Sequence, residues 1–148
     1  MLKNTFCHIP GVGLKSEKKL WEKGIFTWED FSGSEKVLFS SIKDEKLKYF
    51  LEESLYNLEI NNPKYFQSMM PSQLLWRMFP EFKSRAVYLD IETTGLYDFN
   101  EITTISLYDG NNVYYYINGQ NLDNFVDDIL NYDLLVTYNG RSFDVPFI

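Results

Sequence analysis

The sequence predicts an α/β fold in which a helical N-terminal region precedes a mixed sheet. Three observations lead to this prediction. The stretch "KLKYFLEESLYNLEI" carries apolar residues at helical spacing, and "AVYLDIE" alternates apolar and polar residues as a strand does. Two β-rich runs flank "DGNN", which is typical of a hairpin. The expected order in the second half is therefore strand, strand, strand, helix, strand.

The first half of the chain is expected to form two helical segments. Residues 1–31 contain a tight turn at Gly11 and Gly13, followed by a helix that stops at Gly24. Residues 32–84 are expected to be helical, with a further short helix over "PSQLLWRMF" that closes before Pro80. The longest predicted helix has one continuous apolar face, made of Leu47, Phe50, Leu51, Ser54, Leu55 and Leu58.

Residues 85–148 are expected to form the sheet. The first three strands are predicted to be antiparallel, and the helix in "NLDNFVDDILNY" is predicted to cross over to "LLVTY", a strand parallel to the first. This helix is expected to direct five residues inward, which are Leu122, Phe125, Val126, Ile129 and Leu130.

Composition excludes several classes of protein. One histidine and one cysteine exclude a zinc site of the Cys/His type, and "GVGLKS" lacks the spacing of a phosphate-binding loop. No apolar run is long enough to span a membrane or to form a signal peptide, so we expect a cytoplasmic protein. The net charge of −7 is divided unevenly, with +2 in residues 1–85 and −9 in residues 86–148. Bulk charge therefore opposes nucleic-acid binding unless bound cations offset it.

Three acidic residues are expected to meet at one edge of the sheet. Asp90 and Glu92 are two apart on a strand, so both side chains point the same way near its carboxyl end. Asp144 follows the carboxyl end of "LLVTY", which is predicted to lie beside that strand. Clustered carboxylates repel one another unless hard cations such as Mg²⁺ or Mn²⁺ share them. The alternative for Asp-x-Glu alone is a solvated strand face.

The residues around these acids resemble a known family. "YLDIETTGL" and "VTYNGRSFDVPFI" resemble the first and second motifs of the DEDD 3′–5′ exonucleases, a group of the ribonuclease H-like superfamily. "LWRMFPEFKSRAVYLDIETTGL" is similar to a bacterial ribonuclease H-like exonuclease branch with a helical N-terminal segment. The resemblance implies a ribonuclease H-like sheet and a hydrolase that uses two Mg²⁺ or Mn²⁺ ions to cleave phosphodiester bonds. The implied substrate is the single-stranded 3′ end of a nucleic acid.

Matching positions imply roles for individual residues. The implied catalytic metal ligands are Asp90, Glu92 and Asp144, with Asp90 bridging both ions. The positions implied to contact substrate are Thr93, Thr94, Leu96 and Asn139. The residues implied to set and pack the final turn are Phe143, Pro146 and Phe147.

One part of the family pattern is missing from the 148 residues. The pattern includes a later aspartate preceded by a tyrosine or histidine that positions the attacking water, and no such motif follows Asp144. We therefore expect either a C-terminally truncated form of a longer protein or a chain that another polypeptide completes, inactive alone in both cases. The unpaired edge is expected to cause self-association through residues 134–138 or disorder near the C-terminus. The alternative function is a non-catalytic nucleic-acid-binding or interaction module with the same fold.

The N-terminal segment has two interpretations. "HIPGVGLKSEKKLWEKGI" resembles a helix-hairpin-helix element, in which Gly11, Gly13, Lys15 and Lys19 would bind a phosphate. The other interpretation is an ordinary helix start followed by a solvated lysine face.

Overall fold

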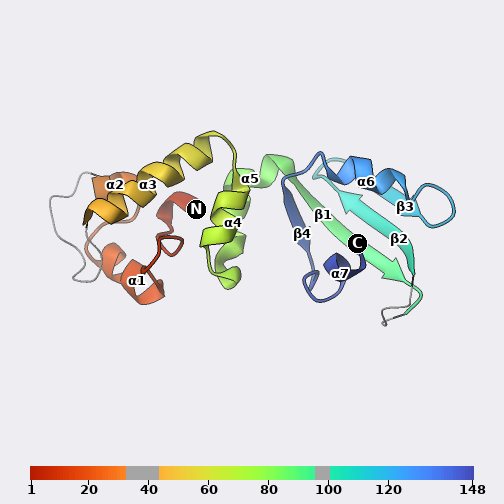
Figure 1. Cartoon of the computed structure of the whole chain (residues 1–148), viewed down its shortest axis with the longest axis horizontal. Helices are drawn as coiled ribbons and strands as arrows, with labels where there is room; N and C mark the ends of the chain where they lie inside the picture. Colours follow the sequence, from red (N-terminus) through yellow and green to blue (C-terminus); the bar gives the residue numbers. More distant parts are fainter. Residues whose placement is uncertain (33–43, 96–100) are drawn as a thin grey trace. The chain divides into compact units, whose positions relative to one another are not determined.

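The computed structural model describes residues 1–32, 44–95 and 101–148, which divide into two compact units (Figure 1). Unit 1 is Met1–Glu81 and unit 2 is Phe82–Ile148. The predicted subdivision of the helical region at residue 31 stays a prediction. Along the parts of the chain that the structure describes, no helix has the length and apolar character needed to cross a membrane.

Unit 1 is built from short helices around an aromatic core. Its elements are η1 (Leu2–Asn4), α1 (Leu14–Glu22), α2 (Trp28–Ser32), α3 (Asp44–Glu59), α4 (Pro63–Met69) and η2 (Ser72–Met78). The rings of Trp28 and Phe66 are stacked with centroids 6.1 Å apart, and the His8 ring lies within 5.8 Å of both. Trp28 also donates its indole N–H to the Thr5 carbonyl at 2.8 Å. The segment before α1 is therefore part of the core.

The predicted short helix after Pro71 differs from the structure. Residues Ser72–Met78 form the 3₁₀ helix η2, and α5 (Phe79–Phe82) continues helical structure past Pro80. The predicted helix ends before Pro80, at Met78, but it is a 3₁₀ helix and α5 follows it directly. Proline is tolerated here because it stands in the first turn of α5, where its missing N–H would have no helical partner.

The buried stripe of α3 departs from the predicted face in its last turns. Leu47, Leu51 and Ser54 are buried as expected, but Leu55 is 36% exposed and Asn57 is buried in its place. Asn57 can be buried because its amide donates to the Glu53 carbonyl at 2.8 Å and its Oδ1 accepts from Asn62 at 2.8 Å. Hydrogen bonding therefore decides which residues of α3 face the core.

A buried carboxylate connects three segments of unit 1. Glu17 is 1% exposed, and its Oε1 accepts hydrogen bonds from the backbone N–H groups of Phe6 at 2.7 Å and Cys7 at 3.3 Å. Its Oε2 accepts from Arg77 at 2.9 Å. Each oxygen of this carboxylate thus has a donor, and the N-terminal segment, α1 and η2 depend on the same group.

Unit 2 contains the predicted mixed sheet. After η3 (Lys83–Arg85) come β1 (Ala86–Thr93), β2 (Ile102–Tyr108), β3 (Val113–Ile117), α6 (Asn124–Ile129), β4 (Leu134–Thr137) and α7 (Asp144–Phe147). The strand order is β3-β2-β1-β4, with β1–β2 and β2–β3 antiparallel and β1–β4 parallel. The predicted strand order and the parallel fourth strand are confirmed. In the described sheet β4 is an edge strand, and self-association through residues 134–138 stays a prediction.

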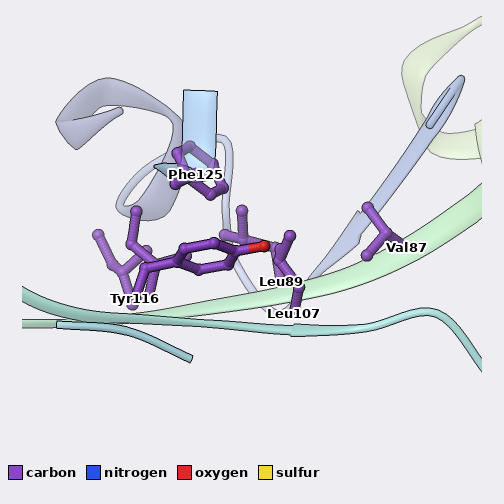
Figure 2. Close-up of a cluster of buried hydrophobic side chains, with 7 residues drawn as sticks. Val87, Leu89, Leu107, Tyr116 and Phe125 are labelled. Atoms are coloured by element: carbon purple, nitrogen blue, oxygen red, sulfur yellow. The ribbon is translucent and has the colours of Figure 1, made fainter. Parts of the chain in front are cut away.

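One face of the sheet carries the core of unit 2. The buried side chains are Val87, Leu89, Ile91, Ile105, Leu107, Tyr116 and Phe125. Figure 2 shows Val87, Leu89, Leu107 and Tyr116 on the same side of the strands, with Phe125 above them. Tyr116 also donates its hydroxyl to Asp128 of α6 at 2.8 Å. Helix α6 is therefore held on this face by an aromatic contact and a hydrogen bond.

Helix α6 buries fewer residues than the sequence predicted. Phe125 is 4% exposed, and Leu122 and Ile129 pack against the core. Val126 and Leu130 are 61% and 75% exposed, so their predicted inward orientation is wrong. Successive helical residues are about 100° apart, so the residue after each of Phe125 and Ile129 turns away from the sheet. A six-residue helix offers a narrower contact than the predicted stripe required.

Removing the buried carboxylate should destabilise unit 1 strongly. We expect Glu17→Ala to lower the free energy of unfolding by about 3–5 kcal/mol, because it leaves Arg77 and two backbone donors without their acceptor. Glu22→Ala, which removes an exposed partner of Lys18, should cost less than about 0.5 kcal/mol. Urea unfolding measures both, and equal effects would contradict the structure.

Acid should destabilise unit 1 through His8. Burial lowers the pKa of His8 from 6.5 to about 4. The Ser54 hydroxyl donates to the Phe50 carbonyl at 2.6 Å, so its oxygen accepts from His8 Nε2 at 2.8 Å and the neutral ring is the form that fits. Below pH 6.5 the unfolded chain binds a proton that the folded chain does not, so stability falls as pH drops towards about 4.

The loss over that window should reach about 3 kcal/mol, because each pKa unit corresponds to about 1.4 kcal/mol. The measurement is urea unfolding of the wild type and of His8→Gln across the same pH range. The variant should show a shallower decline, since its side chain does not titrate. Parallel pH profiles would contradict the assigned role of His8.

Candidate functional site

Strand β1 presents two carboxylates on the sheet face opposite the core. Asp90 and Glu92 are exposed and alternate with the buried Leu89 and Ile91. They pair with Ser106 and Thr104 of β2, respectively. The pairing register shifts between Glu92 and Thr93, which marks a bulge at the strand's end. The two acids therefore stand side by side where regular pairing finishes.

The two threonines that follow close the end of β1 through hydrogen bonds. The Thr93 hydroxyl donates to the Gly95 carbonyl at 2.5 Å. The Thr94 N–H donates to the Glu101 carbonyl at 3.0 Å, and its hydroxyl accepts from the Glu101 N–H at 3.1 Å. Both threonines thus support the local backbone, and a substrate role for them stays a prediction. Leu96, predicted to contact the substrate, lies outside the described residues.

Asp144 occupies a different environment from the two acids on β1. It begins α7 and is 2% exposed, and its Oδ2 is buried without a hydrogen-bond partner among the described residues. A buried carboxylate oxygen without a donor is costly, which favours an additional ligand such as a proton or a cation. Among the described buried side chains of unit 2, Asp144 is therefore the one with an unpaired polar atom.

The turn before Asp144 has a strict local requirement. Asn139 has a positive φ of 56°, and the Gly140 carbonyl accepts from the Val145 N–H at 2.8 Å. A Cβ at Gly140 would lie 1.9 Å from the Thr137 hydroxyl oxygen, so only glycine fits against β4. Gly140 was not predicted from the sequence to be part of the site, although "NG" at residues 139 and 140 is a recognisable turn signal. Asn139 itself is exposed, as a residue that contacts substrate must be.

Aromatic side chains fix the position of α7. Phe143 and Phe147 pack against the core of unit 2, and their rings lie 5.1 Å apart. The predicted packing role of both residues is confirmed. Because α7 is anchored on either side of Asp144, this carboxylate has little freedom to move.

The three acids have the right chemistry for a hard divalent cation, since Mg²⁺ and Mn²⁺ prefer carboxylate oxygens. In residues 1–32, 44–95 and 101–148, however, no three acidic, histidine or cysteine side chains form a group that could hold a metal ion. The structure therefore does not present Asp90, Glu92 and Asp144 as a preformed metal cluster. Their joint action as ligands stays a prediction.

All the net charge of the chain resides in unit 2. It contains three lysine or arginine residues and ten acids, giving 3 − 10 = −7, while unit 1 contains 11 of each and is neutral. Phosphate groups of a nucleic acid would be repelled by unit 2 unless cations offset part of this charge. A cation bound at Asp90, Glu92 or Asp144 would reduce the repulsion of phosphate groups at the candidate site.

The N-terminal candidate site has the expected backbone but no further indication of a ligand. Gly11 has a φ of 92° and Gly13 caps α1, with Lys15 and Lys19 exposed on the helix. Both the phosphate-binding interpretation and the solvated lysine face fit these features. Phosphate binding by the four residues stays a prediction.

The C-terminal part of the chain matches a known family model. Residues 87–148 match the family model described as RNase_H superfamily. Comparisons with curated proteins and with solved structures give no significant match. The matched segment runs from β1 to α7 and includes Asp90, Glu92 and Asp144. Together with the mixed strand order, this match makes the fold of unit 2 ribonuclease H-like, with a helical region before it.

Proposed function

We propose that this chain carries the metal-binding part of a 3′–5′ exonuclease that hydrolyses nucleic acid from a single-stranded 3′ end. The observation that carries the proposal is the buried, unpartnered Oδ2 of Asp144 within the segment that matches the RNase_H superfamily. The same segment contains Asp90 and Glu92 on β1, which is parallel to β4, the strand that precedes Asp144. These acids suit a nuclease, because carboxylates can hold the divalent cations that catalyse hydrolysis of phosphodiester bonds.

The three carboxylates would contribute to the site in two ways. Asp90 and Glu92 are about 7 Å apart along one face of β1, so both can approach the same region. Asp144 is held by the packing of its neighbours Phe143 and Phe147, and it supplies the rigid part of the site. When bound, Mg²⁺ or Mn²⁺ would activate water and stabilise the leaving oxygen. The chain's own contribution is to orient these oxygens.

Residues beside the carboxylates would position the nucleotide. The Asn139 side chain is exposed directly before the Gly140 turn, where its amide can donate to a sugar or phosphate oxygen. Thr94 is exposed at the end of β1, although its hydroxyl already accepts from Glu101. These contacts would place the 3′ end of the nucleic acid near Asp90 and Glu92.

A second candidate function is a non-catalytic nucleic-acid-binding or interaction module. It is favoured by the absence of a preformed metal group among the described residues. The charge of −7 on unit 2 favours the interaction module over nucleic-acid binding, because it repels phosphate groups. The two functions differ in whether divalent cations bind at the three acids. They are therefore separated by the metal-binding experiment and the hydrolysis assay that follow.

Manganese should bind weakly at the three carboxylates. We expect Mn²⁺ to broaden the NMR signals of Asp90, Glu92 and Asp144 selectively, because paramagnetic ions affect nearby nuclei most. Binding should be weak, since three carboxylates leave much of the ion's coordination shell to water. Asp90→Asn should reduce the broadening at Asp144. Asp127→Asn, at an exposed residue of α6, should leave it unchanged. Broadening spread evenly over the acids of unit 2 would contradict a defined site.

Hydrolysis should depend on Asp90. We expect residues 1–148 to degrade 3′-labelled single-stranded DNA or RNA slowly at best, because they supply three of the four carboxylates that the exonuclease pattern contains. Any Mg²⁺- or Mn²⁺-dependent turnover should be lost in Asp90→Asn and retained in Asp127→Asn. Folding should be unchanged in both, since each residue is exposed.

The outcomes distinguish the two functions. Turnover that survives Asp90→Asn would place the chemistry elsewhere in the chain. Selective Mn²⁺ binding without turnover would support an incomplete nuclease site. If the unsubstituted protein shows neither selective Mn²⁺ binding nor turnover, the non-catalytic module would be supported.

A further inference from the structure

In the described part of unit 2, exposed tyrosines lie on the sheet face opposite the core, here called the tyrosine face. Tyr88 of β1 pairs with Tyr108 of β2, which pairs with Val113 of β3. In the next row, Asp90 pairs with Ser106, which pairs with Tyr115. Paired residues in a sheet point to the same side, and this side is opposite the core. The tyrosine face is defined by these six residues.

The tyrosine face is more apolar than an ordinary solvated sheet face. Tyr115 is 60% exposed, Val113 is 51% exposed, and Tyr88 and Tyr108 are 41% and 43% exposed. The rings of Tyr88 and Tyr108 lie 5.9 Å apart and form a continuous aromatic surface. Antiparallel strands normally direct polar residues to the solvent side. Contiguous exposed aromatic residues are typical of surfaces that bind another molecule.

The charge of the tyrosine face restricts what it can bind. The sequences of β1, β2, β3 and β4 contain no lysine or arginine, and the face includes Asp90, with Glu92 one row further along. Unit 2 as a whole carries −7. Nucleic-acid phosphates and anionic membranes are disfavoured, and a second copy would bring its own acids against these. A positively charged partner is complementary.

We propose that the tyrosine face binds a cationic amphipathic segment of a partner protein. Apolar side chains of the segment would pack on Val113 and the tyrosine rings. Arginine or lysine side chains along its border would lie over the rings of Tyr108 and Tyr115 and pair with Asp90. This interaction needs no metal and no hydrolysis, and it shares Asp90 with the proposed metal site.

The test uses residues 1–148 and synthetic labelled probes without divalent cations. One probe is a helical peptide with leucines on one face and arginines along both borders, and its matched control carries glutamates in place of the arginines. A single-stranded oligonucleotide is the third probe. Fluorescence anisotropy should detect binding of the arginine peptide alone, with an affinity that falls as salt rises.

Variants should locate the binding surface. We expect the double variant Tyr108→Thr with Tyr115→Thr to raise the Kd of the arginine peptide about tenfold, and Asp90→Asn to raise it about threefold. Threonine keeps strand propensity, and circular dichroism checks that the sheet is retained. Tyr56→Thr, at a tyrosine that is 58% exposed on α3 of unit 1, should leave the Kd unchanged.

Three results would overturn the proposal. No binding of the arginine peptide would exclude a cationic partner at this face. Equal binding of the arginine and glutamate peptides would show that charge does not select the partner. Binding of the oligonucleotide that is lost in the double tyrosine variant would identify the face as a base-stacking surface instead.

Discussion

The parallel pairing of β4 with β1 is the constraint on which the rest of unit 2 depends. It joins Ala86 to Leu134 at one end and Leu89 to Thr137 at the other. The ends where both strands start are fastened by an ion pair between Arg85 and Asp133 and by a backbone hydrogen bond of 2.9 Å between the same residues. Because the strands run the same way, Asp90 and the turn that leads to Asp144 leave the sheet at the same end.

The two faces of the sheet have different tasks. One face is covered by α6 and by the aromatic residues that flank Asp144, so its packing fixes the single buried acid of the candidate site. The other face carries Asp90, Glu92 and the exposed tyrosines, so it is available to ligands and partners. The proposed metal site would need Asp144 from the covered side and Asp90 and Glu92 from the open side to share a cation, and the described residues do not show these three as a preformed group. The proposed docking surface extends away from Asp90 across β2 and β3.

Two buried polar side chains of unit 1, Glu17 and Ser54, have hydrogen-bond partners inside the unit. Glu17 is bonded on both oxygens, and the Ser54 hydroxyl serves both the Phe50 carbonyl and His8. Such groups are inexpensive while every donor and acceptor is paired and costly once one partner is removed. This explains why a helical unit with short elements can keep a histidine and a carboxylate inside its core.

The elements of unit 2 and their order could be predicted from the sequence, because alternation and turn residues are local properties and crossover rules apply to consecutive elements. The position of Asp90 and Glu92 on one strand face followed from the same alternation. Which side chains are covered could not be predicted: Val126 and Leu130 are exposed, Asn57 replaces Leu55 in the core, and Asp144 is buried with an unpaired oxygen. Periodicity identifies the face of a helix or strand, whereas burial depends on contacts between residues distant in the sequence.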